Sequence, residues 1–108
     1  SRANELTPEL ICALLLHMSR TSSGTRFADM LAAPAEEGTL RGRLTREPYR
    51  SAVRAKTGYL NGVGALSGYA RTRSGTEVAF SILVNTSRPG SMRDRVDALC
   101  RAIVDHAE

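Results

Sequence analysis

Aromatic residues, lysine and long apolar runs are scarce in this chain of 108 residues. It has no tryptophan, two phenylalanines and three tyrosines, and its net charge of +4 is spread along the sequence. With no aromatic signature of RNA binding and no zinc-finger spacing, we expect no nucleic acid partner. The longest apolar run, Ile11 to Leu16, falls well short of the roughly 18 residues that a bilayer requires. We therefore expect no transmembrane segment.

Cysteine and histidine are equally sparse. Cys12 and Cys100 stand 88 residues apart, each in a predicted helix, and there are two histidines and no C-x-x-C motif. The two cysteines would form one disulfide in an oxidising compartment, or remain two small buried apolar residues. Without ligand spacing, we expect neither a metal ion nor another cofactor.

The most informative scarcity is that of lysine. Of the fifteen lysines and arginines, fourteen are arginine, and the one lysine is Lys56 in Ala55-Lys56-Thr57-Gly58. An ammonium is a compact charge with three rotatable donors and can lose a proton when partly buried, unlike a guanidinium. Lys-Thr-Gly at the end of a strand is a signature of penicillin-binding proteins and serine β-lactamases. A surface strand with a solvated lysine is the alternative that this tripeptide alone leaves open.

Hydrophobic periodicity predicts helices first, then strands, then a final helix. Thr7 caps a first helix with Pro8 at its first position and an apolar face of Leu10, Ile11, Leu14, Leu15 and Met18. Strands are expected at about 52–57, 64–72 and 77–85, the last two joined by a hairpin turn, and a helix at about 91–107 capped by Ser91. This order predicts an α+β fold with an antiparallel sheet packed between helices.

Two further helical segments are expected between the first helix and the strands. One carries Phe27, Met30 and Leu31, and Gly38 to Leu44 forms one or two turns. The strand at 77–85 alternates apolar residues on both faces, so both faces should be covered. A sheet with two apolar faces and few helices suggests part of a larger core.

Read as a whole, the chain resembles the D-alanyl-D-alanine carboxypeptidase/endopeptidase family of the penicillin-binding protein 4 type, the class C low-molecular-mass penicillin-binding proteins. The resemblance places residues 1–108 in the C-terminal portion of a transpeptidase/β-lactamase-like domain. The stretches that carry it occur in the family's order and at similar spacing: Ser1 to Asn4 with Leu6 to Pro8, Gly38 to Leu44, Val53 to Gly58, Gly62 to Tyr69, and Ala79 to Asn85.

This resemblance implies a reaction and a location. Family members have a five-stranded antiparallel sheet between helices and hydrolyse D-Ala-D-Ala peptides of peptidoglycan through a serine acyl-enzyme, which penicillins trap. The implied partners are peptidoglycan stem peptides, β-lactam antibiotics and the N-terminal portion of the same protein. The implied location is the periplasm or another extracytoplasmic site at the cell wall.

The resemblance also assigns roles around Lys-Thr-Gly. Lys56 would supply positive charge and a hydrogen bond to a serine of a Ser-x-Asn motif, which eases proton transfer to the leaving group. The Thr57 hydroxyl would bind the substrate carboxylate, and Gly58 would let the substrate lie along the strand edge. The backbone N–H of Tyr59 would be one oxyanion-hole donor.

Two departures from the family pattern qualify this prediction. Position 53 is valine, so the chain holds no Ser-x-x-Lys, and no serine is followed two residues later by asparagine. Alone, the chain should therefore be inactive. Tyr59 replaces the family's small hydroxyl residue, which affects substrate choice. The alternatives are a non-catalytic module that binds muropeptides or a protein, and a nucleophilic Ser1 activated by its own amine.

Overall fold

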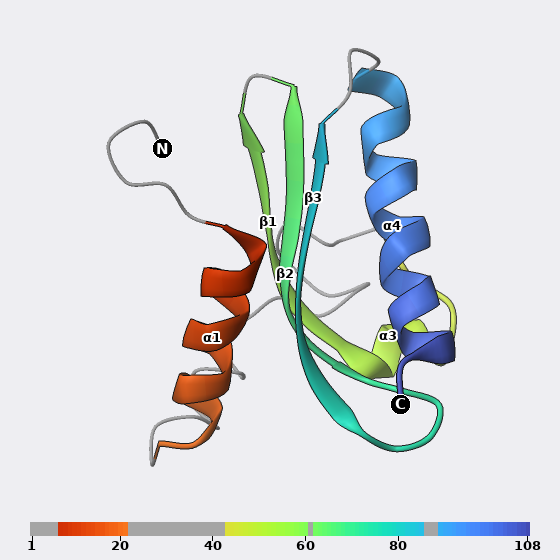
Figure 1. Ribbon diagram of the computed structural model, residues 1–108. Helices are drawn as coiled ribbons and strands as arrows, with labels where there is room; N and C mark the ends of the chain where they lie inside the picture. Colours follow the sequence, from red (N-terminus) through yellow and green to blue (C-terminus); the bar gives the residue numbers. More distant parts are fainter. Residues whose placement is uncertain (1–6, 22–42, 61, 86–88) are drawn as a thin grey trace.

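The structure is a computed structural model that describes residues 7–21, 43–60, 62–85 and 89–108, with backbone only at 59–60 and 89–91. Helix α1 stands on one side of a sheet and helix α4 on the other, with the single-turn helix α3 near the C-terminal end of α4 (Figure 1). In chain order the elements are α1 (Pro8–Ser19), α3 (Tyr49–Ala52), β1 (Val53–Leu60), β2 (Val63–Arg71), β3 (Glu77–Asn85) and α4 (Pro89–His106).

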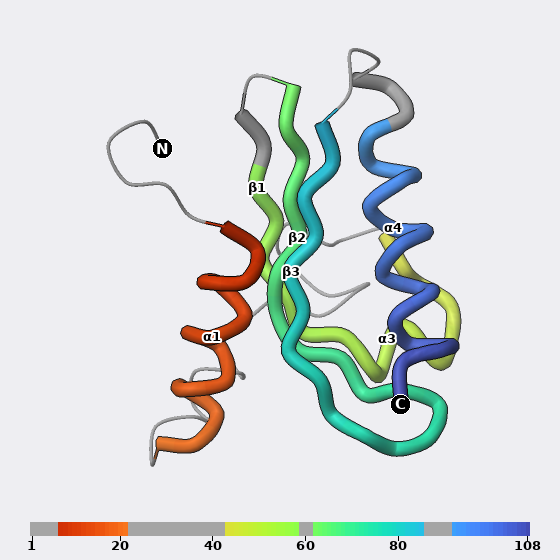
Figure 2. Tube along the Cα trace, viewed as in Figure 1, coloured from red at the N-terminus to blue at the C-terminus, as the bar shows by residue number. Residues whose placement is uncertain are grey.

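The described strands form one antiparallel sheet in the order β1-β2-β3, in which β2 is central (Figure 2). Gly62, directly before β2, has a φ of 80°. Between β2 and β3 the turn is closed by a hydrogen bond from the Thr72 N–H to the Thr76 carbonyl, 2.8 Å, and Gly75 has a φ of 90°. Only glycine adopts such positive φ values without steric cost.

One face of the sheet, here called the α4 face, forms the core with α4. Strand side chains alternate between faces, and the register aligns their apolar rows across all three strands. This core is apolar throughout and includes Val53, Ala55, Leu66, Ala70, Phe80, Ile82 and Val84 of the strands and Met92, Val96, Cys100 and Val104 of α4. This core fixes the position of β1 relative to α4.

The opposite face, here called the α1 face, is covered only in part by the described residues. The Tyr69 hydroxyl donates a hydrogen bond of 2.6 Å to the Leu15 carbonyl, and Leu15 is the buried residue of α1. Leu10 and Leu14, expected in the apolar face of this helix, are 43% and 53% exposed. These two residues belong to the predicted apolar face but stay exposed among the described residues, because α1 packs on the sheet through the side that carries Leu15. Both helices pack against β3, but Leu83 on its α1 face is 44% exposed, so the expectation that β3 is covered on both faces is met only in part among the described residues.

Two helix and strand limits differ from the predicted ones by two residues or more. The Thr7 hydroxyl does cap α1, accepting from the Leu10 N–H at 3.1 Å. Helix α4, however, begins at Pro89, so Ser91 lies inside it; proline suits a first helical position because its φ is fixed and it has no N–H. β1 continues through Gly58 to Leu60. The segment with Phe27, Met30 and Leu31 lies outside the described residues.

The prediction of helical turns up to Leu44 is wrong at its described end. Arg43 and Leu44 form a bend, and Leu44 has a φ of 52°, which a non-glycine residue adopts at a steric cost. Two contacts hold it there. The Leu44 side chain is buried in the core, and Arg43 forms a salt bridge of 2.6 Å with Asp97 of α4. Residues 38–42 lie outside the described part.

The two cysteines are free thiols on opposite faces of the sheet. The Cys12 thiol on α1 faces the Ala79 carbonyl of β3, with 3.9 Å between sulfur and oxygen, whereas Cys100 is buried in the core under α4. A disulfide requires Cα atoms within about 7 Å, which a sheet between the two residues prevents. Burial raises the pKa of the Cys100 thiol to about 12. The structure therefore agrees with the alternative in which Cys12 and Cys100 remain unbridged.

Candidate active site

Lys56 lies near the middle of β1, on the open edge of the described sheet. It is paired with Ser67 of β2 and is exposed. Its neighbours two residues away, Arg54 and Gly58, lie on the same face, and Arg54 is paired with Tyr69, which binds α1. The lysine therefore projects from the α1 face. None of the ion pairs found among the described residues includes it.

Thr57 points the other way. Strand alternation places its side chain with Val53 and Ala55 on the α4 face, where it is half-buried. Its partner in the register is the fully buried Leu66. Lys56 and Thr57 are therefore brought together along the strand but on opposite faces. A ligand bound along the open edge of β1 is the arrangement that can contact both side chains.

Gly58 has space beside it that the described residues do not fill. A Cβ atom built there would come no closer than 3.6 Å to the Ala65 Cβ, an ordinary contact, and the residue is exposed. Gly68 on β2 differs, because a Cβ there would collide with the Arg54 carbonyl oxygen and the Ala55 backbone. Packing thus requires glycine at 68 but not at 58. The open space at Gly58 is what a ligand needs to approach the strand closely.

Tyr59 is described by its backbone alone. It belongs to β1 and is paired with Gly64. Because β1 is an edge strand, alternate residues direct their N–H groups away from β2 and leave them free for a ligand. The described structure thus puts all four predicted site residues at consecutive positions, 56–59, of one strand, beside an edge that no other described strand covers.

Two serines that the sequence analysis did not single out lie on the same face of the sheet as Lys56, on β2 and β3. Ser67 is paired with Lys56, and Ser81 of β3 is paired with Ser67, so the three residues form one row across the α1 face, here called the Lys56 row. The two serine hydroxyl oxygens are 2.9 Å apart and hydrogen-bonded. Only the strand register brings them together.

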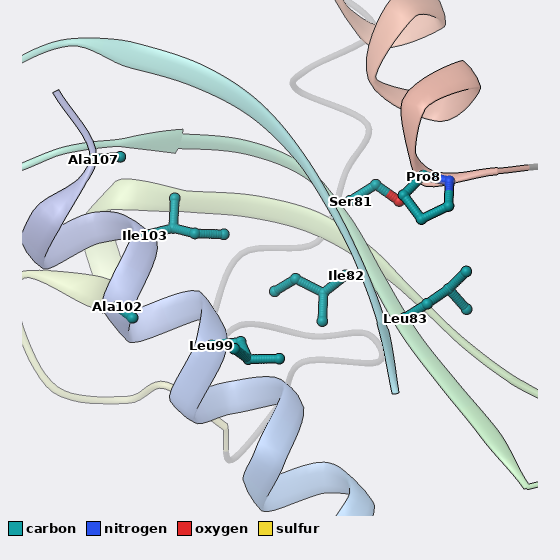
Figure 3. A pocket seen from close by; sticks show the side chains of 8 residues that line it. All are labelled: Pro8, Ser81, Ile82, Leu83, Leu99, Ala102, Ile103 and Ala107. Carbon is teal, nitrogen blue, oxygen red and sulfur yellow. The ribbon is translucent and has the colours of Figure 1, made fainter. Parts of the chain in front are cut away.

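A pocket of about 580 Å³ lies elsewhere, along the outer edge of β3. It is mostly apolar and is lined by Pro8 of α1, by Ser81, Ile82 and Leu83 of β3, and by residues of α4. Figure 3 shows Ile82 pointing toward Leu99 of α4, while Ser81 and Leu83 project on the side of Pro8. Lys56, Thr57 and Gly58 do not line this pocket.

The chemistry available at this edge is electrostatic and hydrogen-bonding. An exposed ammonium, a threonine and unpaired backbone groups can bind an extended peptide and its carboxylate. Neither the Ser-x-x-Lys nor the Ser-x-Asn motif occurs in the chain, and Ser1 lies outside the described residues. No group of three or more His, Cys, Asp or Glu side chains among the described residues could hold a metal ion. No described helix is long and apolar enough to cross a membrane.

The architecture defines a class of α+β domain in which an antiparallel sheet lies between helices and its edge strand carries Lys-Thr-Gly. Comparison with known proteins identifies the family within that class. Residues 1–103 match the model of the D-Ala-D-Ala carboxypeptidase 3 (S13) family, and the chain belongs to this family. The resemblance found in the sequence is thus confirmed.

Individual relatives agree with this assignment. The chain is 28% identical over 97 residues to D-alanyl-D-alanine carboxypeptidase DacB of Haemophilus influenzae, covering 88% of this chain and 20% of that protein. A crystal structure of penicillin binding protein 4 (dacB) from Haemophilus influenzae, complexed with a novel β-lactam, aligns with a TM-score of 0.83 at 23% identity. That alignment covers 98% of this chain and 27% of the other.

A second crystal structure of the same Haemophilus influenzae protein aligns with a TM-score of 0.78 at 24% identity over 98% of this chain and 26% of that one. These alignments confirm the predicted α+β fold. The chain spans about a fifth of the curated relative and about a quarter of the solved structures.

Proposed function

We propose that this chain is the C-terminal portion of a serine-type D-Ala-D-Ala carboxypeptidase/endopeptidase and supplies the Lys-Thr-Gly wall of its active site. The observation that carries the proposal is the position of Lys56 on an open sheet edge, next to a glycine that packing does not require. Family membership supports the reaction class. The substrates would be peptidoglycan stem peptides, and the location the periplasm or another extracytoplasmic site.

In this proposal the stem peptide lies along β1 as an added strand. Its backbone pairs with the free N–H and C=O groups of the edge, and Gly58 allows it to come close. The Thr57 hydroxyl binds the terminal carboxylate across the edge, with the Lys56 ammonium as the counter-charge. A hydrogen bond of this charge-assisted kind contributes about 1.5–3 kcal/mol.

Acyl transfer then needs groups from the N-terminal portion of the protein. The serine of its Ser-x-x-Lys motif attacks the carbonyl carbon of the penultimate D-alanine, and the terminal D-alanine leaves with a proton. Lys56 promotes that proton transfer through its charge and its hydrogen bond to the Ser-x-Asn serine. The Tyr59 N–H stabilises the oxyanion, and one such donor is worth about 10²–10³ in rate. A β-lactam acylates the same serine.

A non-catalytic module that binds muropeptides or a protein is the second candidate. The observation in its favour is that the chain contains no nucleophile motif. Both candidates use the same open edge of β1, so they differ in covalent chemistry and not in the surface employed. Under both, the 108 residues alone form no acyl-enzyme.

Labelling with a fluorescent penicillin separates the two candidates. The complete protein that contains this sequence is incubated with the reagent, run on a denaturing gel and analysed by intact mass. We expect one covalent label per chain, and none on the 108 residues expressed alone or after preincubation with unlabelled penicillin. A folded complete protein that takes up no label would refute the enzyme and leave the binding module.

A further inference from the structure

Arg54 is a second cation on the open edge strand. It stands two residues before Lys56 on β1, so the two side chains project from the same α1 face, about 7 Å apart along the strand. Helix α1 packs mainly on β3 and β2, which leaves this side of β1 open in the described structure. Arg54 therefore borders the same edge as the Lys-Thr-Gly residues.

The Arg54 guanidinium has no partner among the described residues. No hydrogen bond or ion pair of its side chain is found there, although the residue is half-buried. Arg43, which is also half-buried, differs because two of its nitrogens donate to the Asp97 carboxylate. Arg101 of α4 shares with Arg54 the lack of a described partner, so this property alone does not define a site. The distinguishing feature of Arg54 is its position beside Lys56.

The proposed binding mode gives the substrate a direction along β1. The carboxylate of the leaving residue lies at Lys56 and Thr57, and the carbonyl that is attacked lies at the Tyr59 N–H. The substrate chain therefore runs from the C-terminal end of β1 toward its N-terminal end, antiparallel to this strand. Whatever follows the leaving residue extends toward Arg54.

The two reactions of a carboxypeptidase/endopeptidase differ on that side of the bond. In a D-Ala-D-Ala peptide the leaving group is a single residue that ends at its carboxylate, and no part of it extends to Arg54. In a cross-linked peptide the leaving amine belongs to a second stem peptide. That peptide extends further and brings at least one more carboxylate, that of its own C-terminus.

A guanidinium suits the binding of this additional carboxylate. It is planar, always charged, and able to donate two parallel hydrogen bonds to the two oxygens. Lys56 already faces the carboxylate next to the leaving amine, so a second carboxylate requires a second cation further along the strand. Partial burial of Arg54 strengthens the attraction, because less water screens the two charges.

We propose that Arg54 is a specificity-determining residue that binds a carboxylate of the second stem peptide and so favours cross-linked substrates. This inference rests on the proposed function, because the direction of the substrate follows from the roles given there to Lys56 and Tyr59. Arg54 is not a catalytic residue, since it lies beyond the carboxylate of the leaving residue and away from the bond that breaks.

The test compares kcat/KM of the complete protein for a cross-linked muropeptide dimer and for an uncross-linked peptide that ends in D-Ala-D-Ala. For Arg54→Ala we expect the ratio of the first value to the second to fall about tenfold, as for loss of one charge-assisted hydrogen bond. Arg54→Lys should keep part of the ratio, because it retains the charge without the paired donors. Arg54→Gln should match Arg54→Ala and decides the question if the alanine variant does not fold.

A modified substrate identifies the group that Arg54 binds. In the second stem peptide, all carboxylates except the one next to the leaving amine are converted to amides. This change should lower kcat/KM of the wild type for the dimer about tenfold. It should have little further effect in Arg54→Ala, since the interaction is already lost there. Arg101→Ala is the matched control. It removes another half-buried arginine without a described partner, and its ratio should equal that of the wild type.

The possible failures are distinguishable. An unchanged ratio in Arg54→Ala, or an equal effect of amidation in the wild type and this variant, would overturn the inference. A proportional loss of both activities would also overturn it, because Arg54 would then support the fold through a contact with the N-terminal portion. A wild type that cleaves the D-Ala-D-Ala peptide but not the dimer would remove this inference and leave a carboxypeptidase. A wild type that cleaves neither substrate and takes up no penicillin would remove the proposed function itself.

Discussion

The α4 face of the sheet is apolar and closed except at the half-buried Thr57, whereas the α1 face carries a lysine and a glycine on the open edge strand and two serines on the other strands. Leu66 and Ile82 on the first face are buried under α4. Leu83, the next residue of β3, lies on the second face and is 44% exposed. Residues adjacent in sequence thus serve different purposes. The α4 face fixes the position of β1, and the α1 face exposes Lys56 and Gly58 of that strand.

Removal of the Lys56 ammonium should give the largest effect on function. For Lys56→Ala in the complete protein we expect acylation by penicillin to slow by about 10²–10³, as for loss of a group that stabilises developing charge. The side chain is exposed and outside the core, so the thermal midpoint should stay within about 2 °C. Stopped-flow acylation and thermal unfolding measure the two quantities.

Lys56→Arg is the matched control for this prediction. It keeps the positive charge but loses the compact ammonium, so its rate should lie between those of Lys56→Ala and the wild type. Equal acylation rates in all three proteins would mean that the lysine is a solvated surface residue, and the α1 face would then have no role in acylation.

The same truncation on the two faces should differ most in stability. Leu66→Ala removes a fully buried side chain of the α4 face and should lower the free energy of unfolding by about 2–5 kcal/mol. Leu83→Ala on the α1 face should cost less than about 1 kcal/mol in this chain, since 44% of that residue is exposed. Urea unfolding of both variants measures the difference. Equal losses would mean that the α1 face is also a closed core.

Two glycines extend the comparison to the backbone. Gly68→Ala should destabilise by about 1–3 kcal/mol, because the new methyl group collides with the backbone at Arg54 and Ala55. Gly58→Ala should be neutral or stabilising by up to about 1 kcal/mol, since the methyl group fits and the unfolded chain loses freedom. Urea unfolding of the two variants tests this contrast.

Gly58→Ala, which should leave stability unchanged or raise it, should lower activity. The new methyl group would occupy the space in which we propose that the substrate lies. Hydrolysis of a D-Ala-D-Ala peptide by the complete protein should therefore fall about tenfold or more. Normal hydrolysis by a stable Gly58→Ala protein would show that the substrate does not approach the strand there.

Local patterns predicted the parts of the fold that depend on near neighbours. The Thr7 cap depends on the Leu10 N–H three residues away, and the alternation of β3 sorts Phe80 and Ile82 from Ser81 and Leu83. The C-terminal limit of β1 was placed too early because Gly58 was taken as a strand end. Asn61-Gly62, a strong signal for a two-residue hairpin turn, would have corrected it.

In contrast, the residues that make up the Lys56 row depend on the pairing register of strands that are distant in sequence. Ser67 and Ser81 are 14 residues apart in sequence, and a shift of one residue in pairing would put one of them on the other face. The exposure of Leu10 and Leu14 also followed from tertiary packing, because helical periodicity marks an apolar face without stating what covers it. Such features require the three-dimensional arrangement.

The smallest expected effect concerns the rim of the α4 face, where Asp105 of α4 accepts hydrogen bonds from Tyr49 and from Arg73, the latter at 2.7 Å. The hydrogen bond from Arg73 holds the pKa of this carboxyl below its ordinary value of 3.8. A lowered pKa in the folded state stabilises the protein above the unfolded pKa, and this contribution is lost as pH falls through the folded value. Asp105→Asn should therefore lower the thermal midpoint at pH 7 by at most about 3 °C, because the cluster is partly exposed.

Below the folded-state pKa of the Asp105 carboxyl, the wild type and Asp105→Asn should converge, since the carboxyl is then neutral in both states of the wild type. Asp94→Asn on the same helix is the control, because Asp94 is exposed and belongs to none of the ion pairs among the described residues. Thermal melts from pH 2 to pH 7 test both variants. If Asp105→Asn destabilised the protein as much as Leu66→Ala, the α4 face would depend on its polar rim as much as on its apolar rows. The contrast between the two faces of the sheet would then be smaller.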